Sequence, residues 1–172
     1  MARPRNLETT AMDSTIYIDA DACPVKDEIY KVALRHQLQV YVVSNHFIQT
    51  PKSPMINKVI VEKGPDAADN WIIEQVVSGD VVVTNDIPLA ARALEKTAYA
   101  IAPYGKEFTK DSIGMALAQR SLMEQLREVG ERTGGPAFFS PSHRSKFLQI
   151  LNEAIVREKR RQSRSIDRQD HL

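Results

Sequence analysis

The amino-acid sequence predicts an α/β protein, built as a three-layer α/β/α sandwich around a mostly parallel sheet, with further helices at the C-terminal side. Short and almost entirely apolar segments alternate with amphipathic segments of helical period from residue 15 to residue 105. Strands that are apolar on both faces are typical of a parallel sheet covered by helices on both sides. Beyond residue 105 the pattern is purely helical.

The expected elements follow one another in a regular order. Residues 15–20 are an apolar run that ends in acid, which predicts a buried strand. The next helix is expected from Pro24, a residue that suits the first helical position, to Gln37. Residues 47–57 contain two prolines and no period, so we expect a long loop there. The other predicted strands are 39–45, 58–63, 80–86 and 99–105, and the other predicted helices are 64–79, 87–97, 109–131 and 142–161.

The composition predicts one soluble domain in a reducing compartment. Of the 172 residues 42% are hydrophobic, which is enough for a single core. The one cysteine excludes an internal disulfide and is typical of the cytoplasm. No apolar stretch reaches the roughly 18 residues of a membrane helix. We expect a loose extension over residues 1–13, a single domain over 14–157 and a basic, disordered tail over 158–172.

Five aspartates are expected at one edge of the sheet. Asp19 and Asp21 come at the end of the first strand. Asp66 and Asp69 open the helix after the third strand, and Asp86 follows the fourth. In an open parallel sheet the ligand site lies beyond the carboxyl ends of the strands. These five residues, which we call the acidic rim, are therefore predicted to converge there.

Each of these carboxylates has a structural alternative when it is taken alone. A carboxylate at the start of a helix caps it or stabilises its dipole, and this explanation applies to Asp21, Asp66, Asp69 and Asp86. Caps do not need to share one edge, however, and two carboxylates 4 Å apart repel by roughly 4 kcal/mol at an effective dielectric constant of 20. The nearest cations, Lys26 and Lys63, lie outside the acidic segments. A hard divalent cation is the natural partner of such oxygen ligands, so the sequence predicts a metal site.

Four segments together resemble the YaiI/YqxD family of bacterial proteins, and through it the PIN-like nucleases. The segments read YIDADACPVKDEI (17–29), GPDAADNWI (64–72), VVVTNDIPLA (81–90) and GGPAFFSP (134–141). The resemblance covers roughly residues 15–157. One departure is visible after the last segment, where an acid–arginine pair is expected and this chain has His143 and Arg144.

The resemblance implies hydrolysis of phosphodiester bonds with Mg²⁺ or Mn²⁺, with RNA as the favoured nucleic acid. In a PIN domain the first acid ends strand one, which matches Asp19. The second opens a helix about 17 residues before the last, which matches Asp69. The third follows a strand in a T-x-D pattern, which matches Asp86. Asp21 and Asp66 are additional and would complete a second metal position, while Thr84 and Asn85 would orient a carboxylate or the attacking water.

Two other functions remain open at this stage. The DADAC segment is similar to the D-x-D motif of haloacid-dehalogenase-type phosphatases, in which Asp19 would be the nucleophile and Asp21 the general acid. Ser44, at the end of the second strand, would supply a later position of that pattern. Against it, a helix begins at Pro24 where those enzymes insert a flap. The other alternative is a PIN-like module that binds nucleic acid without cutting it.

The remaining candidates are basic residues that would contact phosphates. The sequence favours positions inside ordered segments over the arginine-rich C-terminus, where a solvated helix end is the more ordinary interpretation. The candidates are Lys26, Arg120, Arg127 and Arg144. His46 borders the long loop, where it either faces the rim or forms ordinary polar surface, and the second is the more common role of a loop histidine. Trp71 is expected in the buried stripe of its helix.

Overall fold

One six-stranded sheet forms the centre of the molecule. The computed structural model describes residues 13–128 and 139–170, and in these residues the strands lie in the order β3-β2-β1-β4-β5-β6. All neighbours are parallel except β5 and β6. The strands are β1 (Ile16–Asp19), β2 (Val40–Ser44), β3 (Ile56–Ile60), β4 (Val81–Val83), β5 (Tyr99–Ala102) and β6 (Lys106–Phe108).

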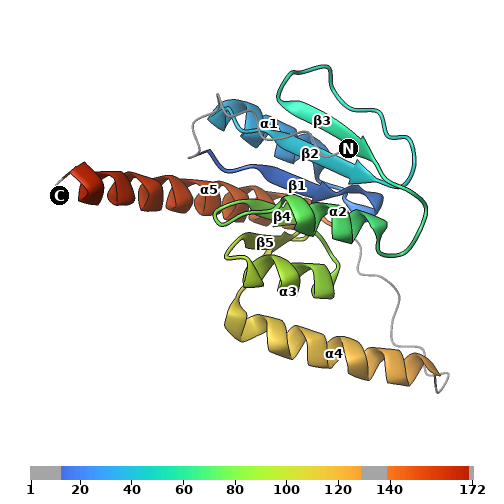
Figure 1. Cartoon of the computed structure of the whole chain (residues 1–172). Helices are drawn as coiled ribbons and strands as arrows, with labels where there is room; N and C mark the ends of the chain where they lie inside the picture. The colour runs from blue at the N-terminus through green and yellow to red at the C-terminus, as the bar shows by residue number, and fades with distance from the viewer. Residues whose placement is uncertain (1–12, 129–138, 171–172) are drawn as a thin grey trace.

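Helices cover both faces of this sheet. The helices are α1 (Lys26–His36), α2 (Ala67–Gln75), α3 (Ile87–Glu95), α4 (Lys110–Glu128) and α5 (Pro141–Asp170), and a short 3₁₀ turn, η1 (Ala20–Ala22), follows β1. The helices α1 and α5 pack together on one face, and α2 and α3 pack on the other. Figure 1 shows α4 beyond α3, away from the sheet, and α5 running past the end of the strands.

Two hydrophobic clusters, one on each face of the sheet, hold the layers together. The first joins Ile16 and Ile18 of β1 to Ile29 of α1 and Phe147 of α5. In the second cluster, the alternate residues of the strands, such as Tyr17, pack against α2 and α3. Because successive side chains of a strand point to opposite faces, a strand between two helical layers must be apolar at every position. The predicted three-layer α/β/α sandwich with a mostly parallel sheet is confirmed.

The end of the sheet differs from the sequence prediction. Residues 99–105 were expected to form one strand, whereas β5 ends at Ala102 and the chain turns back into the antiparallel strand β6. Gly105 permits this turn, since its φ is +93° and a Cβ there would lie 2.9 Å from atoms of Lys146. The strand β6 has only three residues, which is too short for a recognisable period.

The C-terminal segment also differs from the prediction. A disordered tail was expected from residue 158, but α5 continues as a helix to Asp170. Glu158 explains the continuation, because its carboxylate is buried and accepts hydrogen bonds from Tyr99 of β5 and from Arg161 one turn later. The expected loose extension lies almost wholly outside the described residues, as do residues 134–138 of the GGPAFFSP segment.

The long loop between β2 and β3 was predicted correctly over most of its length, although its last two residues, 56 and 57, belong to β3. Among the helices of residues 13–128 and 139–170, none combines the length and the apolar composition that crossing a bilayer requires.

Candidate functional site at the carboxyl edge of the sheet

The site lies where β1 and β4 run side by side. The chain leaves β1 toward β2 and leaves β4 toward β5, so the two connections diverge from this point. Such a divergence opens a crevice beyond the carboxyl ends of the two strands, which is where open α/β sheets bind their ligands. Ile18 is paired with Val83, and therefore the next residues, Asp19 and Thr84, face each other across the crevice.

Thr84 fixes the carboxylate of Asp19. Its hydroxyl donates a hydrogen bond of 2.8 Å to Oδ2 of Asp19 and accepts one of 2.9 Å from the backbone N–H of Asp86. Thr84 is fully buried, so its hydroxyl depends on these partners for its hydrogen bonds. The hydroxyl therefore links the ends of β1 and β4 and holds one oxygen of the Asp19 carboxylate. Asn85, between the two, is exposed.

The helix-cap explanation holds for one of the rim aspartates. Oδ1 of Asp86 accepts a hydrogen bond of 2.9 Å from the backbone N–H of Leu89 and so caps α3. Asp66 stands at the N-cap position of α2 but makes no side-chain cap hydrogen bond. Asp21 does not cap α1, whose N-cap residue is Val25. Capping therefore accounts for Asp86 and leaves the positions of Asp21 and Asp66 unexplained.

Asp69 brings a third carboxylate into electrostatic contact with Asp19 and Asp86. It lies in the first turn of α2 and is half-buried. Burial, followed by repulsion from Asp86, Asp19 and Asp66, raises the pKa of Asp69 to about 6, although Arg92 opposes the rise. Strand β1, helix α2 and the start of α3 thus each contribute an acid, and the three negative charges repel one another.

The pKa of Asp19 is raised for related reasons. Burial is the main cause, and repulsion from Asp21 and Asp86 adds to it, while the hydrogen bond from Thr84 works against it. Like charges held close in a partly buried crevice favour a bound cation or a proton. Strongly shifted carboxylates in a crevice are also typical of functional sites.

Asp21 belongs to a second polar group, on the β2 side of β1. The hydroxyl of Ser44 donates a hydrogen bond of 2.9 Å to Oδ1 of Asp21, and Nδ1 of His46 lies 3.2 Å from the same oxygen. The side chain of His46 is 58% exposed, so it lies at the polar surface as expected, and it also faces Asp21 of the rim. The signal in the sequence was Ser44, because Asp19 pairs with Val43 and the next residue of β2 must reach the same edge.

The proposed phosphate-binding residues come from three helices, α1, α4 and α5. The guanidinium of Arg144 lies 2.5 Å from Oε1 of Glu28 and over the ring of Phe139, which ties α5 to α1. Arg120 is exposed on α4, and the side chain of Arg127 lies outside the described part of the structure. Lys26 opens α1 and is half-buried. Arg144 is therefore engaged in a contact within the protein.

His143, at the position that departs from the family pattern, has a structural contact at the start of α5. Its Nδ1 accepts a hydrogen bond of 3.1 Å from the backbone N–H of Ser140.

The sequence matches a known family over most of its length. A model described as "Uncharacterized BCR, YaiI/YqxD family" matches residues 17–157, a range that contains the whole acidic rim. The chain belongs to the YaiI/YqxD family.

Curated relatives within this family carry the name "UPF0178 protein". One from Caulobacter vibrioides is 55% identical over 149 residues, which are 87% of this chain and 97% of the relative. One from Rhodopseudomonas palustris is 57% identical over 148 residues, 86% of this chain and 94% of the relative. One from Azorhizobium caulinodans is 59% identical over 146 residues, 85% of this chain and 92% of the relative. No solved structure gives a significant match.

The carboxylates of this YaiI/YqxD protein are the type of ligand that binds a hard cation. Their positions in this structure do not form a coordination site. Within residues 13–128 and 139–170, no three histidine, cysteine, aspartate or glutamate side chains form a group that would hold a metal ion as they stand. Two oxygens are turned to other partners, Oδ2 of Asp19 to Thr84 and Oδ1 of Asp86 to Leu89. Aspartates that repel one another are expected to turn apart, and side-chain rotations would be needed to gather them.

Proposed function

We propose that this protein is a divalent-metal-dependent nuclease that hydrolyses phosphodiester bonds, with RNA as its favoured substrate. The observation that supports the proposal most is the meeting of Asp19, Asp69 and Asp86 at the crevice between β1 and β4. The pKa of Asp19 and that of Asp69 are raised by burial first and by neighbouring carboxylates second. A bound cation would remove that repulsion, and carboxylate oxygens are the ligands that Mg²⁺ and Mn²⁺ prefer.

The residues of the rim would have different roles in catalysis. Asp19, Asp69 and Asp86 would hold the metal, with Asp21 and Asp66 in or beside its coordination shell. Bound there, the metal would supply an activated water and neutralise charge on the phosphate. Thr84 keeps Asp19 in a fixed direction through its 2.8 Å hydrogen bond, which is the support that a metal ligand ordinarily needs. Asn85 is beside Thr84 and would contact the substrate or the water.

The polyanionic substrate requires cations near the rim. Lys26, at the start of α1 and five residues after Asp21, is one candidate. Arg92 of α3 is a further one, which the sequence alone did not indicate and which acts on the charge of Asp69. Arg92 donates a hydrogen bond of 3.1 Å to Asn70, next to Asp69. Contacts of this kind depend on phosphate charge, so binding should weaken as the salt concentration rises.

A cleavage assay tests this proposal. In the presence of Mn²⁺, wild-type protein should cut a labelled single-stranded oligoribonucleotide, and Asp19→Asn should lower the rate by about a hundredfold or more. Asp111→Asn, at the exposed start of α4, is the matched control and should retain the wild-type rate. Cleavage that continues unchanged in Asp19→Asn would contradict the proposal.

One observation favours a second candidate, a phosphatase of the haloacid-dehalogenase type. Ser44 of β2 lies 2.9 Å from Asp21, the second acid of the D-x-D segment. The same assay separates the two candidates when a generic phosphomonoester is offered beside the oligonucleotide. Turnover of the monoester alone would favour the phosphatase, and binding of the oligonucleotide without turnover of either substrate would favour a non-catalytic module.

A further inference from the structure

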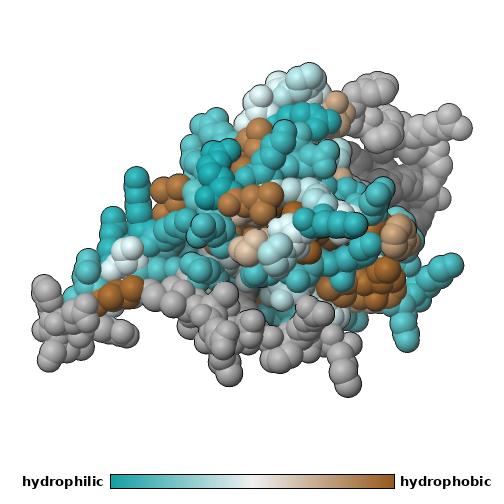
Figure 2. Space-filling view, turned by 90° about the horizontal axis from the view of Figure 1, so that it is seen from above, coloured by the Kyte–Doolittle hydropathy of each residue, from teal (hydrophilic) through white to brown (hydrophobic). Residues whose placement is uncertain are grey.

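The strand β3 lies at one edge of the sheet, and the long loop that connects it to β2 arches past its outer side (Figure 1). In the sheet formed by the described residues it has a neighbour, β2, on one side only. An edge strand exposes a row of backbone N–H and C=O groups that another strand can pair with. Figure 2 views the molecule from above, the side on which β3 lies in Figure 1, and hydrophobic patches appear there among hydrophilic side chains.

The hydrogen-bond pattern fixes which backbone groups of β3 point outward. The C=O of Met55 accepts from Val40 and the N–H of Val61 donates to Ser44, so odd-numbered residues bond to β2. Alternate residues of a strand direct these groups to opposite sides. Lys58 and Ile60 therefore turn their N–H and C=O groups to the outer edge, and Glu62, two residues beyond the end of β3, would do the same in a longer strand.

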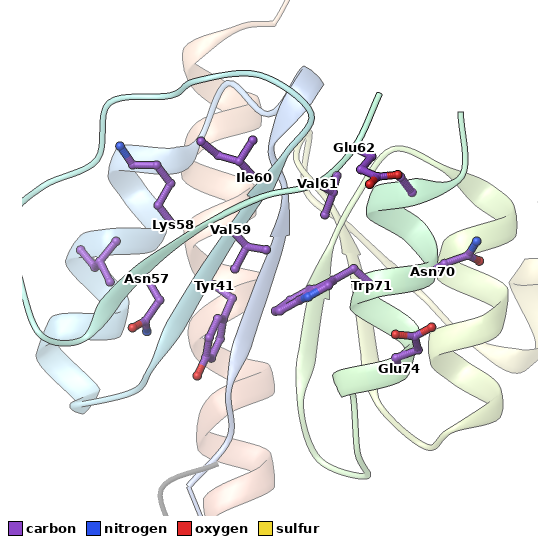
Figure 3. A pocket seen from close by; sticks show the side chains of 12 residues that line it. Tyr41, Asn57, Lys58, Val59, Ile60, Val61, Glu62, Asn70, Trp71 and Glu74 are labelled. Atoms are coloured by element: carbon purple, nitrogen blue, oxygen red, sulfur yellow. The ribbon is translucent and has the colours of Figure 1, made fainter. Parts of the chain in front are cut away.

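The side chains at this edge are unusually apolar for an exposed strand. Ile60 is 55% exposed, and Phe47, whose ring lies 4.0 Å from Nζ of Lys58, is 73% exposed. Figure 3 shows Lys58 and Ile60 on one side of β3 and Asn57 and Val59 on the other. An open hollow of about 750 Å³ runs between β3 and α2, and its lining includes Tyr41, Val59 and Trp71 as well as Lys58 and Ile60.

The charged side chains along β3 favour a second copy of this chain as the partner, and they favour one register of the strand pairing. When β3 pairs antiparallel with β3 of a second copy, a two-fold axis relates the two strands. This axis can pass beside residue 58, 59 or 60, and its position sets which residues lie opposite each other. Centring on residue 58 sets the two lysines opposite each other, and centring on residue 59 sets Lys58 opposite Ile60. Centring on Ile60 sets Lys58 of each copy opposite Glu62 of the other. Opposite charges across an antiparallel pair are stabilising and like charges are destabilising, so the last register is favoured.

We propose that the protein forms a two-fold dimer through antiparallel pairing of β3 with β3 of a second copy, centred on Ile60. The pairing joins the two sheets into one and gives backbone partners to Lys58, Ile60 and Glu62. It places Val59 of each copy beside Val61 of the other, on the side of the hollow. A lone lysine on an edge strand ordinarily discourages pairing, but here Glu62 stands where it neutralises Lys58 of the second copy.

The experiment measures the oligomeric state of the full chain by sedimentation equilibrium over a range of concentrations. The wild type should show a monomer–dimer equilibrium. Lys58→Glu and Glu62→Lys should each raise the dimer dissociation constant by about tenfold or more, because each creates two like-charge pairs. The double variant Lys58→Glu/Glu62→Lys restores opposite charges in the same register and should dimerise like the wild type. Lys110→Glu, on α4, is the matched control and should leave the equilibrium unchanged.

Three outcomes would overturn the proposal. A wild type that stays monomeric at all concentrations would leave the edge of β3 to a different partner. A dimer that Lys58→Glu does not weaken would use another surface. Failure of the double variant to recover dimerisation, when both single variants lose it, would rule out the register centred on Ile60. Each variant changes one or two exposed side chains, and its folding can be checked by circular dichroism.

Discussion

At the scale of single residues, folding places the carboxylate of Asp69 where its negative charge is unfavourable. Its ordinary pKa is 3.8, and burial together with Asp86, Asp19 and Asp66 raises the pKa to about 6. An acid with a raised pKa binds its proton more tightly in the folded state than in the unfolded chain. Its contribution to stability is therefore present below pH 3.8 and is lost as the pH rises toward 6.

We predict that Asp69→Asn removes this loss. Between pH 4 and pH 6.5, without divalent ions, the free energy of unfolding of the variant should rise relative to that of the wild type by on the order of 1–2 kcal/mol, after allowance for solvent screening. Urea unfolding at a series of pH values in the presence of a chelator measures the difference. Asp111→Asn serves as the control and should track the wild type. A constant difference between Asp69→Asn and the wild type across this range would show that Asp69 is not strained by its neighbours.

Residue roles were harder to predict than residue positions. The rim aspartates could be placed because each one follows a strand or opens a helix, and topology then brings strand ends to one edge. The contact of Asp21 with Ser44 and His46 depends on which strand is the neighbour of β1 and on side-chain direction. Neither is contained in the local pattern of the sequence, which placed His46 near the surface loop but left open whether it faces the rim.

At the scale of elements, α5 depends on a buried charge. Burial alone would raise the pKa of Glu158, but hydrogen bonds from Arg161, Tyr99 and Gln162 hold it below its ordinary value. The carboxylate packs against the turn at Gly79, where a Cβ would overlap with Oε1 of Glu158. Glu158 and Tyr99 are 59 residues apart in the sequence, so composition alone predicted a solvated tail at this point.

We predict that Glu158→Gln destabilises the protein by about 1–3 kcal/mol, because a charged acceptor of several hydrogen bonds is replaced by a neutral group with fewer acceptor sites. Chemical denaturation at pH 7 measures the loss. Glu153→Gln, an exposed position one turn earlier in α5, is the control and should change the stability by less than about 0.5 kcal/mol. Equal stability of Glu158→Gln and the wild type would mean that the buried carboxylate does not anchor α5.

At the scale of the whole molecule, the layers were predictable and the edges of the sheet were not. Apolar strands that alternate with amphipathic helices fix a parallel sheet between two helical layers, and this part of the fold follows from hydrophobic burial alone. The short strand β6 depends on the turn at Gly105. The edge of β3 is exposed because no further strand pairs with it among the described strands. Such features are set by the tertiary arrangement, which a periodic pattern does not encode.

The proposed metal site depends on the assembled fold. Asp19, Asp69 and Asp86 come from β1, α2 and the start of α3, so the carboxylates meet only when the sheet and its helices are assembled. A cation that binds them would bind the folded state and stabilise it by mass action. The central claim is therefore that the acidic rim holds a divalent metal.

Calorimetric titration of the metal-free protein with Mn²⁺ tests this claim most directly. We predict saturable binding by the wild type and a loss of affinity of about tenfold or more in Asp19→Asn and in Asp86→Asn. Asparagine is a good N-cap residue, so Asp86→Asn should retain the cap of α3 and remain folded. Asp111→Asn is again the control and should bind as the wild type does. Equal affinity for Mn²⁺ in the wild type and in both rim variants would contradict the account.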